Sequence, residues 1–195
     1  MMAERQLAAR AIQWLVWAIF MLAVMRWMSR SRNRPRPPAE ERVLSHPRST
    51  LIMGLVCFVF FAGAAIVSNV FRNHTTTWWT TSIFVGFAVL SFPMITDYFI
   101  ARHRVSEDGL AYRKITGVAK YLRWSELRRV RYATGMKWFR LETQSGEVAR
   151  ISAMLMGLPE FARLLLANAP KAAIDADALP VLQATAGGDA PSVWA

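Results

Sequence analysis

The sequence is poor in residues on which many functions depend. It has one cysteine, Cys57, in 195 residues, which excludes an internal disulfide framework and a cysteine-based zinc site. Its three histidines, His46, His74 and His103, lie in three separate segments, so they are not expected to form one metal centre. The length also excludes a large multidomain enzyme. We therefore expect no metal and no other cofactor.

Motifs of common enzyme chemistry are also absent. No glycine-rich phosphate loop, HExxH, GxSxG or paired-carboxylate motif occurs. A Ser/His/Asp triad can be assembled from distant residues, so a motif search alone does not exclude one. A transport path is poorly supported, because only Asp97 is ionisable deep within the apolar stretches. We expect a protein that is not an enzyme, with an enzyme or transporter as a third hypothesis.

Acidic residues are scarce as well. The chain has 13 Asp and Glu against 24 Lys and Arg, a net charge of +11, yet 54% of its residues are hydrophobic and its mean hydropathy is +0.22. Soluble proteins of this size seldom combine so much charge with so much apolar character. The two must lie in separate stretches, as in a small membrane protein.

Three apolar stretches, at residues 7–28, 51–71 and 78–100, are predicted to span a membrane. The second has no charge in 21 residues and is the strongest signal. The first has a short uncharged centre flanked by Arg10 and Arg26, whose side chains can reach the interfaces. A signal peptide or a surface helix is its alternative. No small-residue cleavage site follows it, which favours retention in the mature protein.

Within the second and third stretches, three features invite a structural or functional interpretation. The small residues at 62–65 form a patch where another helix could pack, or are simply lipid-facing. Pro93 is expected to kink or end the third helix. Asp97 is expected at the headgroup level, as an interfacial carboxylate near Arg102 or Arg104.

Charge bias predicts the orientation of these spans. Seven arginines lie in the connection between the first two stretches, which a Pro-rich segment makes stiff: Arg26, Arg30, Arg32, Arg34, Arg36, Arg42 and Arg48. The second connection has only Arg72 near the membrane. We therefore expect a multi-pass inner-membrane protein with its N-terminus outside and residues 101–170 in the cytoplasm.

Residues 101–170 alternate over short segments and predict a small α+β domain. Strands are expected at 103–106, 110–115, 121–124, 127–133, 137–143 and 147–153, as part of six or seven antiparallel strands. A helix with Pro159 in its first turn is expected to close one end. The predicted core is Trp124, Trp138, Phe139, Leu141, Phe161 and Leu165. Residues 171–195 are expected to be largely disordered, with a weak helix near 172–182.

Two motifs in this region resemble a known family. The hairpin VSEDGL at 105–110 and the segment WSEL at 124–127 are similar to those of the bacterial pleckstrin-homology-like domains that are fused to membrane spans. The resemblance covers about residues 100–168 and implies a PH-like barrel capped by a C-terminal helix. It implies a binding or scaffold role and no particular chemistry. The first hairpin is acidic here, so the resemblance carries over no phosphoinositide pocket.

Basic side chains are the candidate site. Juxtamembrane arginines attract anionic lipid, but a solvated basic face that only sets topology is the alternative. The candidate lipid- or partner-binding residues are Arg102, Arg104, Arg128, Arg129, Arg131, Arg34 and Arg36. Aromatic platforms beside the basic groups are too few to suggest nucleic acid.

The first functional hypothesis is a membrane-anchored scaffold at the cytoplasmic face, contacting anionic lipid, a protein partner or both. The second is an accessory subunit of a larger membrane complex, or a homo-oligomer, that acts through its transmembrane helices.

Overall fold

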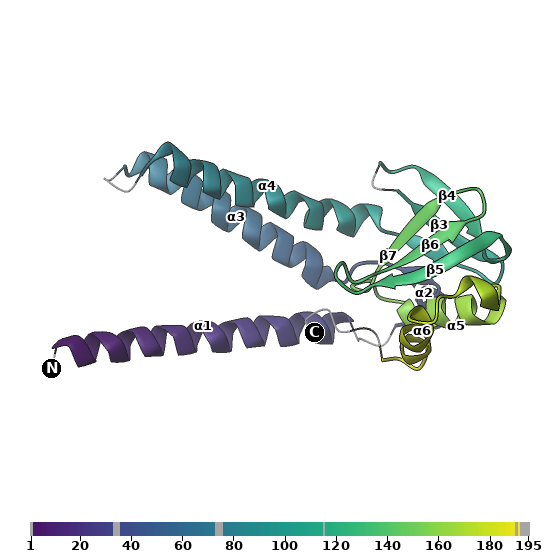
Figure 1. Ribbon diagram of the computed structural model, residues 1–195. Coiled ribbons are helices and arrows are strands. Elements are labelled where there is room, and N and C mark those ends of the chain that lie inside the picture. The colour runs from purple at the N-terminus through teal and green to yellow at the C-terminus, as the bar shows by residue number, and fades with distance from the viewer. Residues whose placement is uncertain (1, 33–35, 73–75, 115, 190, 192–195) are drawn as a thin grey trace. The chain divides into compact units, whose positions relative to one another are not determined.

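The computed structural model of the protein describes residues 2–32, 36–72, 76–114, 116–189 and 191. The chain divides into two compact units at residue 34. The first unit is one helix, α1 (Met2–Arg32), drawn in purple in Figure 1. Its segment Ile12–Ser31 is long and apolar enough to cross a membrane, and the side chains of its apolar window are unburied. An apolar, unburied surface of this length is what lipid would cover.

The second unit begins its membrane part with two antiparallel helices, α3 (Arg48–Val70) and α4 (Trp78–Ile100), both of spanning length. They lie side by side along their length (Figure 1). Near the connection, the Asn69 side-chain amide donates to Thr81 Oγ1 at 2.9 Å. Further along, Phe61 stacks on Phe87 with ring centroids 4.9 Å apart. The prediction of three membrane-length helices is therefore confirmed.

Two features expected within these helices, the small-residue patch and Pro93, can be compared with the structure. The helices approach closely at Gly54, where an added Cβ would lie 2.9 Å from Ile95, whereas one added at Gly63 in the predicted patch would meet nothing within 4 Å. Of the patch, Ala65 is buried. Pro93 does not end the helix, because α4 continues through it to Ile100. Contacts with α3 continue on both sides of the proline, because Phe92 packs edge-on against Phe58 and Ile95 lies beside Gly54.

The domain that follows contains the six predicted strands. They are β2 (His103–Val105), β3 (Gly109–Arg113), β4 (Ala119–Arg123), β5 (Leu127–Ala133), β6 (Trp138–Thr143) and β7 (Val148–Ser152). All neighbouring pairs are antiparallel. The predicted helix is present as α5 (Leu158–Asn168), with Pro159 in its first turn. The alternating pattern thus located each element correctly.

The strands form two sheets instead of one closed barrel. The sheet orders are β1-β2-β3-β4 and β5-β6-β7, and no ladder joins β4 to β5 among the described residues. A single 3-10 turn, η1 (Trp124–Glu126), separates these two strands and turns the chain from one sheet to the other. Trp124 is anchored there because its indole N–H donates to the Ser106 carbonyl at 3.0 Å. The predicted PH-like fold of antiparallel strands and a C-terminal helix is confirmed, but its two sheets are not closed into a barrel.

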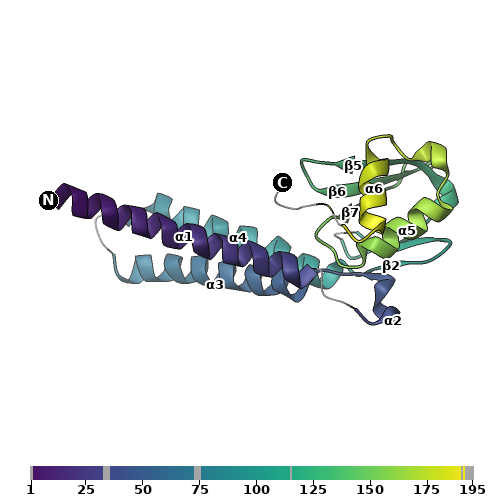
Figure 2. The ribbon, with the colours of Figure 1, turned by 90° about the horizontal axis from the view of Figure 1, so that it is seen from below.

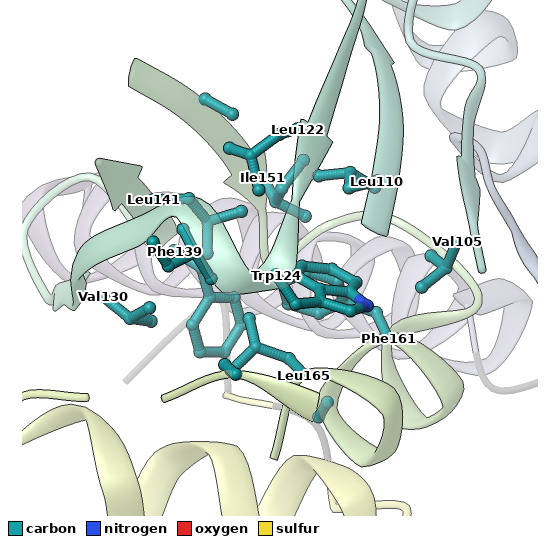
Figure 3. Close-up of a cluster of buried hydrophobic side chains, with 14 of the residues drawn as sticks. Val105, Leu110, Leu122, Trp124, Val130, Phe139, Leu141, Ile151, Phe161 and Leu165 are labelled. Carbon is teal, nitrogen blue, oxygen red and sulfur yellow. The ribbon is translucent and has the colours of Figure 1, made fainter. Parts of the chain in front are cut away.

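The core lies between the two sheets and α5. Figure 3 shows Trp124, Phe139 and Phe161 packed together with Leu141 and Leu165 beside them. These five predicted core residues are fully buried or nearly so. The sixth, Trp138, is only half-buried, which corrects the prediction. Successive strand residues face opposite sides, so Phe139 and Leu141 face inward and Trp138 faces outward, where the Arg150 guanidinium lies 5.5 Å from its ring.

The domain also recruits a segment from the predicted basic loop. Residues that precede α3 form α2 (Pro38–Glu41) and the edge strand β1 (Val43–Leu44), which pairs with β2. Gly157 lies against this segment, and only a glycine fits there. Its φ is +84°, and an added Cβ would lie 2.8 Å from the Val43 carbonyl oxygen. The sheet of the domain predicted to begin at residue 101 therefore includes an edge strand from the connection before α3.

The predicted disordered tail is wrong for residues 171–189. This segment forms a 3-10 turn, η2 (Lys171–Ala173), and a helix, α6 (Ala178–Ala186), that packs on α5 (Figure 2). Leu182 and Thr185 of α6 are fully buried. The Asp175 amide donates to the Val130 carbonyl at 3.0 Å, which ties the tail to β5. The weak helix predicted near residues 172–182 is present as α6, which begins six residues later, at Ala178.

Candidate functional site

An open pocket of about 830 Å³ lies where α3 begins, α4 ends and the first sheet starts. The last turn of α4 contributes Tyr98 and Phe99, and the first residue of α3 contributes Arg48. Strands β1 to β4 contribute one side, which includes the small residue Ala111 opposite Arg104. The pocket forms where β1, which precedes α3, pairs with β2, which follows α4, next to the ends of the two helices.

The pocket is strongly basic. Its lining includes one carboxylate, Glu40, and six basic side chains, which are Arg36, Arg48, Arg102, Arg104, Arg113 and Lys120. Two of the six are committed to structural contacts. The Arg36 guanidinium donates to the Val43 carbonyl at 2.7 Å and pairs with Glu40 at 3.7 Å. Lys120 forms an ion pair with Glu147.

The remaining four arginines, which we call the pocket arginines, are Arg48, Arg102, Arg104 and Arg113. None of them forms an ion pair with any side chain in the part of the chain that the structure describes. All four are exposed. Uncompensated like charges in one hollow produce a positive potential that an anion would lower.

Two histidines that are far apart in the sequence meet beside this pocket. Pairing of β1 with β2 sets Leu44 opposite His103, and His46 follows two residues after Leu44. Burial lowers the pKa of His46, and the charge of Asp97 partly offsets this effect. Burial, and then the neighbouring His46, lower the pKa of His103 to about 4. Both imidazoles are therefore neutral at pH 7.

Asp97 was expected near Arg102 or Arg104. Among the described side chains it forms no ion pair with either arginine, and its charge acts on His46 instead. The strand that follows α4 carries Arg104 into the sheet, whereas Asp97 is still within the helix and close to the start of α3. Arg102 and Arg104 therefore do not have the Asp97 carboxylate as the ion-pair partner that the sequence suggested.

The pocket lies close to the membrane if α3 and α4 span it. Three residues separate β1 from α3, and two separate α4 from β2. An extended chain advances about 3.5 Å per residue, so the sheet starts within about 10 Å of the helix ends. Tyr and Trp side chains favour this interfacial level, and Tyr98 is such a residue in the lining.

The predicted arginines on β5 behave differently. Arg128 and Arg131 contact the two oxygens of the Glu142 carboxylate at 3.4 and 3.2 Å, and Arg140 joins them at 2.8 Å. Burial raises the pKa of Glu142, but these three arginines outweigh that effect and lower it overall. Arg129 donates to Asp175 at 3.0 Å. We call Arg128, Arg129 and Arg131 the β5 arginines.

The predicted site residues therefore divide into two places. Arg36, Arg102 and Arg104 line the pocket, and Arg128, Arg129 and Arg131 belong to the β5 arginines. Arg34 lies outside the described residues. The sequence interpretation missed Arg48, Arg113 and His46 as pocket residues, because an entire helical hairpin separates them in the chain. For Arg48 and His46 the available signal was their position within a few residues of the start of a predicted span, whereas Arg113, 13 residues after Ile100, carried no such signal.

The fold and the pocket define a class: a membrane-associated protein with a PH-like domain built on a helical hairpin. Residues 101–192, just under half of the chain, match the family model of the bacterial PH domain, so this region is a bacterial PH domain. The match extends through α6, in agreement with its packing. Comparison with curated proteins and with solved structures found no match.

Proposed function

We propose that the protein is a membrane-anchored binding module whose PH-like domain binds an anionic leaflet through the pocket arginines. The observation that carries the proposal is that four arginines without ion-pair partners, among the described residues, surround one pocket at the base of the membrane hairpin. Each basic residue near an anionic surface contributes about 1 kcal/mol. The domain is already tethered, so even a part of this energy is enough to hold it in one orientation.

The membrane and its sidedness are part of the proposal. The arginine-rich connection before α3 supports a cytoplasmic domain at a bacterial inner membrane, with the N-terminus outside. Lipid contact would fix the orientation of the domain and leave the face opposite the pocket available to a protein partner. A reporter fused to the C-terminus should be active only as a cytoplasmic reporter, and activity of an exported reporter there would contradict this orientation.

Hydrogen exchange of the full chain in lipid nanodiscs tests the lipid contact. A fragment of residues 101–171 would lack β1 and α6, so the complete protein is required. Replacing neutral phosphatidylcholine with a mixture that contains phosphatidylglycerol should slow exchange in β2, β3 and β4. High salt should reverse the effect, because exposed charges are screened.

A matched pair of variants assigns the effect to the pocket. The triple substitution Arg102→Gln, Arg104→Gln and Arg113→Gln should abolish the protection. The control, Arg123→Gln, Arg150→Gln and Arg163→Gln, removes the same charge from exposed positions outside the pocket lining and should retain it. Equal exchange in neutral and anionic nanodiscs, or equal loss in both variants, would overturn the proposal.

A further inference from the structure

Three arginines form a row across the outer face of the second sheet. Phe139 and Leu141 of β6 face the core (Figure 3), so Arg140 between them faces outward. The strand register sets Arg131 of β5 on one side of Arg140 and Arg150 of β7 on the other. Residues directly opposite each other share a face, and like charges in such pairs destabilise a sheet. The row is therefore unfavourable for the fold alone, and an anionic partner would stabilise it.

Ion pairing compensates only part of this charge. One buried carboxylate, that of Glu142, is shared by three side chains, which are Arg128, Arg131 and Arg140. Arg150 forms no ion pair with any side chain that the structure describes. Four arginines against one carboxylate leave three positive charges uncompensated. A partner of this face is therefore expected to be acidic.

Glu142 also fixes the positions of the guanidinium groups. Its ion pairs use the Nη2 atom of Arg131 and the Nε atom of Arg140, whose side chains are 40% and 37% exposed. A guanidinium has five N–H donors, so one with a single nitrogen engaged can donate to a second carboxylate. Side chains that are already held in place lose less freedom when a partner binds. The shared carboxylate thus prepares the row for binding.

The spacing of the row matches that of side chains along a helix. Neighbouring strands lie about 4.8 Å apart, so three strands place the arginines over about 10 Å. On a helix, residues four apart have Cβ atoms about 5–6 Å apart, and seven residues advance about 10 Å. An extended segment presents side chains on one face only every 6.8 Å or so, roughly twice its rise per residue. Carboxylates at positions i, i+4 and i+7 of a helix fit the row better.

Trp138 adds an apolar contact beside the row. It lies two residues before Arg140 on the same face, is half-buried, and has the Arg150 guanidinium 5.5 Å from its ring. Tryptophan and arginine are enriched among the side chains that contribute most to protein–protein binding. Single-stranded nucleic acid is bound on several aromatic platforms, and Trp138 is the one outward aromatic residue among the described residues of β5, β6 and β7. The face therefore fits a protein better than a nucleic acid.

We infer that the outer face of β5, β6 and β7 binds an acidic helix of another protein. Carboxylates of that helix contact Arg131, Arg140 and Arg150, and an apolar side chain beside them contacts Trp138. The inference goes beyond the proposed function, because the pocket is lined by the first sheet and this face belongs to the second. It requires no anionic lipid.

A pair of designed peptides tests the spacing. One is an alanine-based helix with glutamates at positions i, i+4 and i+7 and a leucine beside them. The other has the same composition, with its glutamates distributed around the helix. The full-length protein in phosphatidylcholine nanodiscs should bind the first peptide at least fivefold more tightly. Equal affinities, which indicate unspecific attraction of charge, or no binding of the first peptide would overturn the inference.

Substitutions assign this binding to the row. Arg131→Gln together with Arg150→Gln should weaken binding of the first peptide at least tenfold. The control, Arg123→Gln together with Arg163→Gln, removes the same charge from exposed positions on β4 and α5 and should leave the affinity unchanged. Equal weakening by the two double substitutions would contradict a site on the second sheet.

Arg150→Gln alone keeps the site falsifiable if the double variant folds poorly. Arg150 shares no carboxylate with another arginine, so this variant should keep its thermal stability while its affinity for the first peptide falls several-fold. An unchanged affinity would exclude the β7 end of the row. Because these assays use neutral lipid, their failure would leave the proposed lipid contact standing.

Photo-cross-linking in native membranes identifies the occupant. Val148 lies two residues before Arg150 on the same face of β7, and benzoylphenylalanine in its place should cross-link to a protein segment with carboxylates at helical spacing. The product should disappear when Arg131→Gln and Arg150→Gln are added. A cross-link to nucleic acid, to lipid or to a second copy of this chain, or the absence of any product, would reject an acidic helix as the partner.

Discussion

The β5 arginines and the pocket arginines are alike in residue type but differ in their surroundings. On β5, Arg128 and Arg131 share the buried Glu142 with Arg140, and Arg129 is paired with Asp175. Around the pocket, four arginines lack any ion pair among the described residues. In a chain with 24 basic and 13 acidic residues, the few acids decide which basic surface remains free. The comparison shows that arginine content alone does not locate a binding surface.

The largest expected difference between the two regions is their response to acid. The pKa of His103 is about 4 in the folded protein and 6.5 in the unfolded chain, so the unfolded chain binds the extra proton between these values. Stability should therefore fall as the pH is lowered through this window, by about 3 kcal/mol at pH 4. The lowered pKa of His46 acts in the same direction. Thermal unfolding of the detergent-solubilised protein from pH 7.5 to 4 measures the loss.

His103→Gln is the matched variant, since its amide oxygen can accept the Arg113 N–H that His103 Nδ1 accepts at 3.2 Å. It should reduce the pH dependence above pH 4.5. Above pH 4.5 the contribution of the β5 region to stability should not depend on pH, because the pKa of Glu142 lies below its usual value and its carboxylate stays charged. An identical loss in wild type and variant would exclude His103 as the source.

The next largest effect is expected from Glu142→Gln. The substitution leaves Arg128, Arg131 and Arg140 without their shared carboxylate, and we expect a loss of about 2 kcal/mol, the contribution of buried hydrogen bonds to charged groups. The slowest-exchanging amides of β5 and β6 report this free energy of unfolding. Glu126→Gln, which affects only an exposed pair with Arg123, should change nothing. Equal effects of the two substitutions would contradict the distinction between the regions.

A smaller effect is expected from Asp175→Asn. Asp175 accepts from Arg129 on β5, while its backbone amide donates to Val130, so the side chain makes one of the two hydrogen-bonding contacts between Asp175 and β5. We expect faster hydrogen exchange in α6 and a smaller drop in melting temperature than for Glu142→Gln. Unchanged exchange in α6 would show that apolar packing of Leu182 alone holds the helix in place.

The smallest effect on stability is expected from the pocket arginines themselves. Replacing Arg102, Arg104 and Arg113 by glutamine removes exposed like charges and no described ion pair. Surface substitutions of this kind usually change stability by no more than about 0.5 kcal/mol. A much larger loss, measured as for Glu142→Gln, would mean that these arginines support the fold, and the contrast with the β5 arginines would disappear.

Local patterns predicted most of the elements. Alternation over short segments located six strands, and the absence of charge over long segments located the membrane-length helices. The same reasoning failed where an element depends on a distant partner. Strand β1 has two residues and forms because β2 lies beside it. Helix α6 has little charge pattern of its own and is held by α5 and β5.

The candidate site was predicted in part for the same reason. Proximity to a predicted span was enough to select Arg36, Arg102 and Arg104. It was not enough to exclude Arg128 and Arg131, because Glu142 reaches them only after β5 pairs with β6. Nor could it connect His46 with His103, which are separated by both helices of the hairpin.

The amino-acid order by itself determined the division of this protein into membrane-length helices and a basic antiparallel domain, since hydrophobic length and strand alternation are properties of neighbouring residues. Only the tertiary structure decided which arginines are neutralised and which remain free. Ion pairs act over a few ångströms, and the partners here come from different strands: Arg129 and Asp175 are 46 residues apart in the chain. Strand pairing brings such partners together on β5 and leaves the pocket arginines without them.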